Sequence, residues 1–174
     1  MRPTDRNCGG GARPPFRVSD RVIVPRPRAP YAGRRFSQFA VGDSFGDDVQ
    51  VTDGHLADGA RLIGDFNPLH VDADFAGRSR FGGCILHGVI TSALMSAPFG
   101  NVVSGTAIGY LEHNTCFLAP VRAGDTLRIA WTVVALAPKP ARGGGIVTAE
   151  CEARNEHGVL VATAVGKMMV GEGG

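Results

Sequence analysis

The stretch HGVITSALMSAPF, residues 87–99, is small and apolar on nearly every side. A helix that is apolar all round is buried in a protein core, whereas a surface helix shows a single apolar stripe. Pro98 and Gly100 are residues that typically end a helix. The stretch therefore predicts a central, buried helix at His87–Phe99, and the rest of the domain is expected to pack around it.

After this helix the chain changes to runs rich in Val, Ile, Thr and Ala, which favour β-strands. Turn residues separate the runs at 120–125, 138–144 and 155–158. Three or four long antiparallel strands in a meander are expected. They are Val102–Phe117, Thr126–Ala137, Gly145–Asn155 and Val159–Val170.

Before the central helix, the sequence predicts a short strand at Asp47–Val51 and a short helix at His55–Gly64. Thr52 and Asp53 supply capping oxygens for that helix. A strand, a short helix, a loop, a buried helix and a run of strands describe an α+β domain. We expect a curved antiparallel sheet that wraps a long central helix, in a single domain at residues 31–174.

Residues 1–30 are basic and rich in Pro, Gly and Arg, and such a segment holds neither a helix nor a central strand. We interpret it as a flexible tail. Residues 1–35 hold nine Arg and two Asp, a net charge of +7, and the other nine basic and 14 acidic residues give the rest −5. A mildly acidic body argues against a nucleic-acid partner. No apolar run is long enough to span a membrane.

The four cysteines, at positions 8, 84, 116 and 151, include no Cys-x-x-Cys pair. Their spacing therefore does not indicate a zinc site or a redox motif. Cys84, Cys116 and Cys151 stand in apolar surroundings, where a free thiol packs as a small hydrophobic group. A reduced protein in the cytoplasm fits this pattern best.

The segment Gly64–Asp72 contains the candidate chemistry. Asp65 and His70 lie five residues apart across a turn that Pro68 stiffens, so a carboxylate and an imidazole can face one small space. Such a pair can hold a water molecule and move its protons, and their surroundings decide which group is the base. Asn67 can hydrogen-bond across the turn. The alternative is that Asp-x-Asn-Pro forms a turn without any catalytic role.

The residues that open the central helix are a second candidate. A helix that starts after His87 presents free backbone N–H groups at its positive end, where they can stabilise an oxyanion. Gly88 would allow a thioester to approach the backbone closely. Its other interpretation is close packing of the helix against the sheet, and Gly88 alone does not decide between them.

Other kinds of site are not indicated. The carboxylates are scattered, and no set of His, Cys, Asp and Glu has a recognisable ligand spacing, so no metal site is predicted. Ser92 and Ser96 lie in the central helix without the Gly-x-Ser-x-Gly elbow of serine hydrolases. The three glycines at 143–145 lack the helix and the lysine of a phosphate-binding loop.

Taken together, the motif at Asp65–His70, then Ala76, and His87-Gly88 at the start of a buried helix resemble the MaoC-like dehydratases. This family includes the (R)-specific enoyl-CoA hydratases. The segment Tyr110–Val121 and the turn after it are also similar, and the resemblance covers about Phe36 to Val170. It implies the hot-dog fold and, commonly for such proteins, a homodimer or higher oligomer formed by joining sheets at their edges.

The resemblance also implies roles for individual residues. Asp65 and His70 correspond to the family's catalytic pair, and the Gly88 N–H corresponds to its donor to the thioester carbonyl. Asn67 corresponds to the asparagine that fixes the loop, and Ser96 to a helix serine that supports it. The basic extension is not part of the family's single-domain pattern, and the family's small residue before the acidic position is here Ile63-Gly64.

The predicted function is reversible syn addition of water to a trans-2-enoyl thioester of coenzyme A or of an acyl-carrier protein. No metal or redox cofactor is expected, because the thioester itself acidifies the proton on C2. The sequence leaves two alternative functions open. One is a hot-dog thioesterase, and the other is a non-catalytic subunit that binds acyl thioesters.

Overall fold

The structure, a computed structural model, describes residues 22–23 and 31–173. Within these residues the helices and strands are, in chain order, β1 (Val22–Ile23), the short 3-10 helix η2 (Phe36–Gln38), β2 (Ser44–Gln50), α1 (Asp53–Ile63), α2 (Pro68–Val71), α3 (Ala73–Arg78), α4 (Gly88–Val102), β3 (Ala107–Phe117), β4 (Thr126–Lys139), η3 (Pro140–Arg142), β5 (Gly144–Arg154) and β6 (Leu160–Gly171). The α-helices all lie before β3, and strands make up most of the chain after them.

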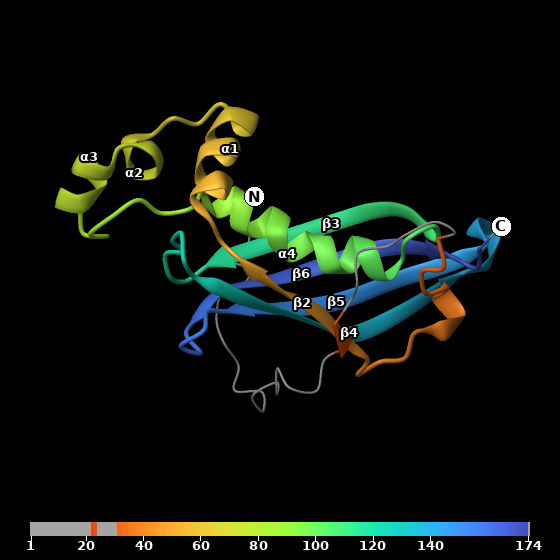
Figure 1. The fold of residues 1–174 in the computed structure, drawn as a ribbon. Helices are drawn as coiled ribbons and strands as arrows, with labels where there is room; N and C mark the ends of the chain where they lie inside the picture. The colour runs from red at the N-terminus through yellow and green to blue at the C-terminus, as the bar shows by residue number, and fades with distance from the viewer. Residues whose placement is uncertain (1–21, 24–30, 174) are drawn as a thin grey trace, which may run out of the picture.

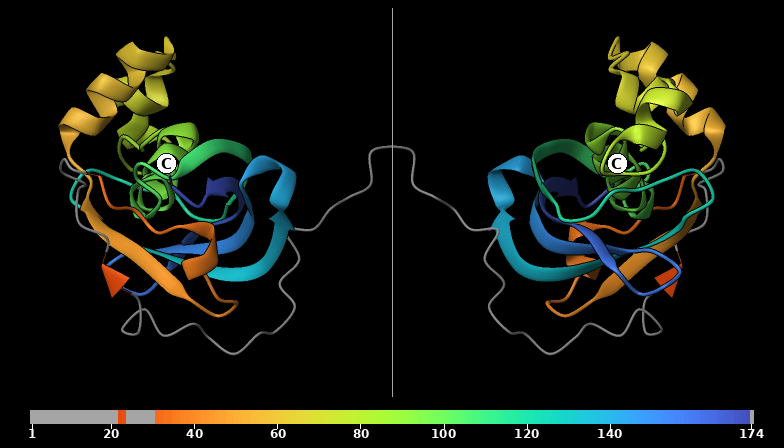
Figure 2. Two further views of the ribbon diagram at one scale, coloured as in Figure 1. Left: turned by 90° about the vertical axis from the view of Figure 1, so that its right-hand side faces the viewer. Right: turned by 90° about the vertical axis from the view of Figure 1, so that its left-hand side faces the viewer.

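One sheet of six strands in the order β1-β2-β4-β5-β6-β3 forms the body of the molecule. Every pair in it is antiparallel except β1 with β2. The helix α4 lies along one face of the sheet (Figure 1), and the sheet curves around that face (Figure 2). This is the curved sheet around a helix that the sequence predicts, and it is the hot-dog fold that the family resemblance implies.

Aromatic side chains join α4 to the sheet. The ring of Phe99 in α4 lies 5.1 Å from that of Trp131 in β4 and 5.4 Å from that of Phe45 in β2. The indole N–H of Trp131 donates to the carbonyl oxygen of Met95 at 2.8 Å, which satisfies its polar atom inside the core. All four residues are buried, so the helix and the sheet share one apolar core.

The strand order differs from a simple meander. β4, β5 and β6 pair in sequence, but β3 pairs with β6 and does not neighbour β4. The meander is therefore confirmed for three strands and wrong for Ala107–Phe117. Strand pairing at the end of a sheet depends on long-range packing, which the local pattern of side chains does not encode.

The end of the central helix also differs from the prediction. Pro98 lies inside α4, which continues to Val102. Proline removes one backbone hydrogen bond and costs about 3 kcal/mol or more in a helix interior. Phe99 and Val103 are both fully buried beyond it. Their burial outweighs the penalty of the proline, since full burial of such side chains contributes about 1.5–3 kcal/mol each.

The prediction that α4 is buried all round is wrong in the single chain. Thr91, Met95, Pro98 and Phe99 are buried, but Val89 on the opposite side is 58% exposed. The helix therefore packs on the sheet with one face. Among residues 22–23 and 31–173 of one copy, no packing contact explains the apolar character of its other face.

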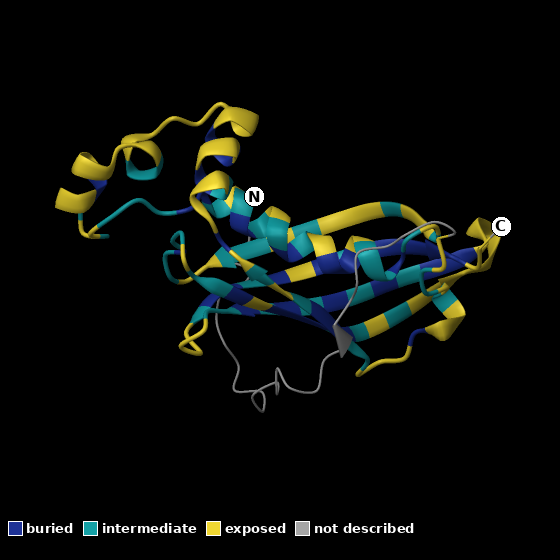
Figure 3. Ribbon diagram, in the orientation of Figure 1, coloured by how far each residue is buried: buried dark blue, intermediate teal, exposed yellow. Residues whose placement is uncertain are grey.

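The helices α1, α2 and α3 form an arm that extends beyond the sheet at the end where α4 begins (Figure 1). Most of the arm is exposed, while β5 and β6 in the middle of the sheet are largely buried or half-buried (Figure 3). Among the described residues, no helix is long and apolar enough to cross a membrane.

The tail predicted at residues 1–30 lies outside the described residues, apart from Val22–Ile23, which form β1 at the edge of the sheet. Two of the cysteines predicted to be reduced, Cys84 and Cys151, are free thiols. Cys116 is disulfide-bonded, so the prediction is wrong for this residue. Proximity to another cysteine is a property of the folded chain, which the spacing of cysteines does not reveal.

Candidate active site

The turn between α1 and α2 carries the acidic residue. Gly64 ends α1 in the left-handed region, with φ of 74°, a conformation that costs glycine least. The chain therefore leaves the helix sharply, and Asp65 follows at once. The Asn67 side chain caps α2 by accepting the Leu69 N–H at 3.1 Å, and Pro68 occupies the first helical position. Cap and proline together fix the direction in which α2 starts.

His70 on α2 is held in one tautomer. Its Nδ1 lies 2.7 Å from the carbonyl oxygen of Ile85, which can only accept, so Nδ1 carries the proton. The Ile85 N–H in turn donates to the carbonyl oxygen of Leu69 at 3.1 Å, which ties α2 to the loop before α4. Nε2 of His70 therefore carries the free lone pair of the ring, which a general base requires.

The Asp65 carboxylate lies beside this ring. Its Oδ1 accepts the Asn67 N–H at 3.0 Å, and this leaves Oδ2 available. One ligand-type atom each from Asp65, His70 and His87 all lie within 4.8 Å of one another. The structure therefore brings the predicted acid and imidazole together, at a separation that a single water molecule bridges by hydrogen bonds of ordinary length.

The third member of this cluster is the side chain of His87, for which the sequence did not predict a role. It is 1% exposed, and its ring stacks on that of His70 with centroids 3.7 Å apart and planes at 27°. Its Nε2 lies 2.9 Å from the carbonyl oxygen of Asp65. The only signal in the sequence was its place just before a helix that opens with Gly88, because its partners come from other elements.

Gly88 begins α4 next to the cluster. Among the described residues its N–H has no acceptor, and the His87 side chain does not cap the helix. A Cβ built on Gly88 would lie 2.9 Å from Cε2 of Phe117, closer than real Cβ contacts. The close-packing interpretation of Gly88 is therefore confirmed, and the free N–H at the positive end of the helix remains available for an oxyanion.

A cavity of about 330 Å³ opens beside His70 and Gly88. Its wall is mostly apolar, with Arg80 and Thr91 as further polar members. The residues that line it are His70, Arg80, Phe81, Ile85, Leu86, Gly88, Thr91, Phe117, Leu118, Ala119, Pro120, Val121 and Val161. A cavity with an apolar wall and a few polar groups at one end suits a small acyl group. Sequence patterns alone did not indicate Arg80 or Thr91.

Ser96 is placed differently from what the family resemblance implies. The Ser96 hydroxyl donates to the Ala93 carbonyl oxygen within α4 at 2.8 Å, and Ser96 does not line the cavity. The structure does not bring it to Asp65 or His70. Phe66, which follows Asp65 in the motif, is 60% exposed, and Asp65 itself is exposed in the single chain.

Asp65, His70 and His87 are also the group that could hold a metal ion among the described residues. Zinc binds imidazole nitrogen at about 2.0–2.1 Å along the lone pair, which lies in the plane of the ring. The two imidazoles stack at 27°, so their lone pairs do not converge on a common point. His87 Nε2 is in addition bonded to a backbone carbonyl. The arrangement suits proton transfer better than metal coordination.

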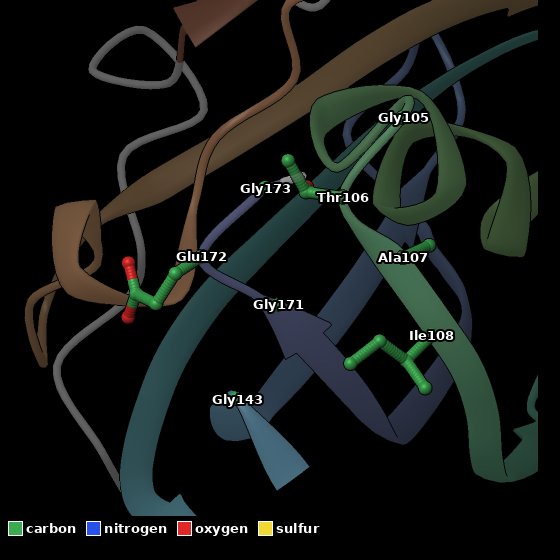
Figure 4. Close-up of a pocket in the computed structure, with 8 residues that line it drawn as sticks. All are labelled: Gly105, Thr106, Ala107, Ile108, Gly143, Gly171, Glu172 and Gly173. Atoms are coloured by element: carbon green, nitrogen blue, oxygen red, sulfur yellow. The ribbon is translucent and has the colours of Figure 1, made fainter. Parts of the chain in front are cut away.

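A second hollow, of about 220 Å³, lies between the start of β3 and the end of β6 (Figure 4). Glycines and backbone form much of its wall. Its carboxylate, Glu172, points away toward η2 (Figure 4), where it accepts the Ser37 hydroxyl and N–H at 2.6 and 3.1 Å. The hollow therefore offers no free reactive side chain, and the chemistry of the molecule gathers at the other end of α4.

The sheet wrapped around α4 and the acid–imidazole turn beside the start of this helix define a protein of the hot-dog class. A sequence profile described as "MaoC like domain" matches residues 39–154. The chain belongs to the MaoC-like family. The match includes both parts of the candidate site, the motif Asp65–His70 and the helix start at Gly88.

Characterised relatives carry hydratase and dehydratase names. The 3-hydroxybutyryl-CoA dehydratase of Methylorubrum extorquens is 34% identical over 53% of this chain and 59% of its own length. The (R)-specific enoyl-CoA hydratase of Rhodospirillum rubrum is 38% identical over 46% of this chain and 56% of its own. These alignments span less than two thirds of either relative. The solved R-hydratase PhaJ1 of Pseudomonas aeruginosa has a TM-score of 0.71, at 28% identity, over 79% of this chain and 86% of that one.

Proposed function

We propose that the protein is an (R)-specific enoyl-thioester hydratase that also catalyses the reverse dehydration. The observation that carries the proposal is that the Asp65 carboxylate lies beside the His70 ring, and that His70 and Gly88 line one largely apolar cavity. Gly88 opens α4, a different element from the turn that carries the acid and the imidazole, so its approach to them is not a by-product of local turn geometry. The names of the relatives support the choice of substrate class and of stereochemistry.

The free Nε2 of His70 takes a proton from a water molecule that Asp65 Oδ2 also holds. The water oxygen bonds to C3 of the enoyl thioester, and the electrons of the double bond move toward the thioester oxygen. The protonated Nε2 then returns a proton to C2 on the same face, which gives syn addition. A positioned general acid–base group contributes about a hundred- to ten-thousand-fold in rate.

The backbone N–H of Gly88 donates to the thioester oxygen as negative charge develops there. It lies at the positive end of a helix of 15 residues and has no acceptor among the described residues. A single oxyanion donor contributes about a hundred- to a thousand-fold. Because Gly88 and His70 line the same cavity, one bound thioester can reach both groups.

Turnover of crotonyl-CoA, followed by loss of enoyl absorbance, tests the proposal. The Asp65→Asn and His70→Ala variants are expected to lose at least about a hundredfold in kcat/KM, since the first neutralises the carboxylate that holds the water and the second removes the general base. Asp74→Asn and His157→Ala are matched controls on exposed residues of the same types and are expected to keep wild-type activity. Wild-type activity in Asp65→Asn or His70→Ala would refute the mechanism.

The same assay separates the alternative functions. Release of free thiol from an acyl-CoA, detected with a thiol reagent, would identify a thioesterase instead. Stoichiometric binding of acyl-CoA without turnover of any enoyl thioester would identify a binding subunit. An intact acid–imidazole pair beside an oxyanion donor supports hydration over both.

We propose that the reaction needs no metal or redox cofactor, because the thioester acidifies the C2 proton. The cluster of Asp65, His70 and His87 makes a direct check worthwhile. Activity is expected to survive dialysis against a chelator unchanged. Loss of activity that added zinc restores would contradict this part of the proposal.

The position of Arg80 supports a substrate that carries a phosphate group. It lines the cavity, its guanidinium lies 4.9 Å from the centroid of the Phe81 ring, and it is exposed to solvent. Coenzyme A and acyl-carrier protein both present a phosphate at the end of the pantetheine arm, which an arginine binds well. Arg80→Gln is expected to raise KM for crotonyl-CoA about fivefold, about 1 kcal/mol, with kcat unchanged.

We further propose a homodimer or higher oligomer. β3 is the last strand of the sheet and exposes apolar side chains at Ile108, Leu111 and Phe117. A long apolar edge strand is usually covered by another chain. Light scattering is expected to give at least twice the mass of one chain. We also propose a cytoplasmic location, which the free thiols Cys84 and Cys151 support and the disulfide-bonded Cys116 does not.

A further inference from the structure

We propose that His87 is a positioning residue that fixes the acid, the base and the oxyanion donor relative to one another. This inference rests on the proposed hydratase function and deepens it. His87 touches none of the reacting atoms in the proposed mechanism. It acts through its contacts with Asp65 and His70 and through its bond to Gly88.

The first contact fixes the acidic turn. The Asp65 carbonyl oxygen can only accept, so His87 Nε2 carries the proton and donates across 2.9 Å. The two residues are 22 positions apart, and the bond joins the turn after α1 to the start of α4. Asp65 is exposed, so this buried donor restrains its backbone where packing does not.

The second contact fixes the base. The His87 ring covers one face of the His70 imidazole at a centroid distance of 3.7 Å. The hydrogen bond from His70 Nδ1 to Ile85 sets the direction of the ring edge, and the stacked ring restricts rotation about it. Both restraints are needed to aim Nε2, because a hydrogen bond alone permits the ring to tilt.

The third link is covalent. His87 is the N-cap residue of α4, and Gly88 follows it directly. Any shift of the His87 ring is therefore coupled to the backbone that carries the oxyanion donor. One residue thus relates the three groups that the mechanism requires at fixed distances, and a misplacement of about 1 Å can cost on the order of a hundredfold in rate.

Packing alone does not account for a histidine at this position. The other ring nitrogen, Nδ1, is buried without a hydrogen-bond partner among the described residues and faces Gly59 of α1, where an added Cβ would lie 3.6 Å from it. An unpaired buried acceptor costs about 1–3 kcal/mol. A phenylalanine ring would fill the same space without that cost, so the Nε2–H bond to Asp65 is the feature that only the histidine supplies.

The test compares His87→Phe, which keeps a ring but loses the donor, with His87→Gln, which keeps a donor. His87→Phe is expected to lower kcat for crotonyl-CoA about a hundredfold with KM changed less than about threefold. His87→Gln is expected to have a kcat about tenfold higher than that of His87→Phe. His113→Phe is the matched control, since His113 Nε2 is also buried and has no partner in the part of the chain that the structure describes, but lies on β3. The kcat of this variant should stay within about twofold of wild type.

Wild-type kcat in His87→Phe would overturn the proposal. Equal losses of kcat in His87→Phe and His87→Gln would also overturn it. A third contradicting result would be that kcat falls in proportion to the loss of thermal stability, by the same relation in His87→Phe and in His113→Phe. Nitrogen-15 NMR of the full wild-type chain adds a readout that needs no substrate. His87 protonated at Nε2 and His70 at Nδ1 are expected, and the opposite tautomer at His87 overturns the proposal. Expected tautomers in a protein that hydrates no enoyl thioester would instead refute the proposed function.

Discussion

The sheet and the arm formed by α1–α3 are stabilised in different ways. In the sheet, large side chains such as Trp131, Leu127 and Ile129 are fully buried. In the arm, Phe66 is 60% exposed, and helix caps and backbone hydrogen bonds hold the turn. The sheet therefore draws its stability from apolar burial, whereas the arm depends on local geometry and on a few contacts with α4.

This difference separates stability from function. Segments with few buried apolar contacts open most easily, and functional groups are often placed on them. Here Asp65 and His70 lie on the weakly packed arm, and Gly88 lies on the helix that the sheet holds rigidly. His87 connects the two regions. Substitutions in the sheet should therefore change the free energy of unfolding, and substitutions in the arm should change mainly turnover.

The largest effect is expected for Trp131→Ala in the sheet. The change removes a fully buried ring, its contacts with Phe99 and its hydrogen bond to Met95. Loss of a buried aromatic side chain costs about 3–5 kcal/mol. Urea unfolding of the variant measures the loss, and a change below about 1 kcal/mol would contradict the view that this core carries the fold.

A matched pair of glycine substitutions compares the two regions directly. A Cβ on Gly166 would lie 2.9 Å from the rigid, buried Trp131, and Gly166→Ala should destabilise by about 1–3 kcal/mol. A Cβ on Gly59 would lie 3.0 Å from Cγ1 of Ile90, a side chain that can move. Gly59→Ala also gains up to about 1 kcal/mol of helix propensity, so its stability should stay within about 1 kcal/mol of wild type.

The cap of α2 tests the arm alone. Asn67→Ala removes the acceptor for the Leu69 N–H, which costs about 1 kcal/mol of local stability. Turnover of crotonyl-CoA is expected to fall about tenfold or more, because His70 lies on the helix that this cap orients. Asn67→Asp keeps a capping oxygen and should restore most of the activity. Full activity in Asn67→Ala would show that the cap does not position His70.

The smallest effect is a dependence on pH that arises in the sheet. Burial lowers the pKa of His113 below its ordinary value of 6.5. The unfolded chain then binds the proton at higher pH than the folded chain, so stability falls as pH drops from above 6.5 through the folded pKa. His113→Gln should remove this part of the pH dependence. An unchanged slope in urea titrations across that range would contradict it.

Much of the fold could be predicted from the sequence, because apolar residues recur along its helices and strands with clear periods. The expected strand Gly145–Asn155 became β5 at Gly144–Arg154, and buried and half-buried residues alternate along it. The pairing of β3 with β6 and the course of α4 past Pro98 could not be predicted in the same way. Both depend on what the distant chain packs against these residues.

For the site, the sequence by itself determined that an acid and an imidazole stand five residues apart on a turn stiffened by Pro68, since local geometry follows from residue type. Only the tertiary structure decided that the His87 ring stacks on His70, that Ile85 sets the His70 tautomer and that Ser96 lies away from them. These contacts join residues whose distance in space depends on how α1, α2 and α4 pack. No local pattern specifies that packing, because it is a sum of many weak interactions across the whole domain.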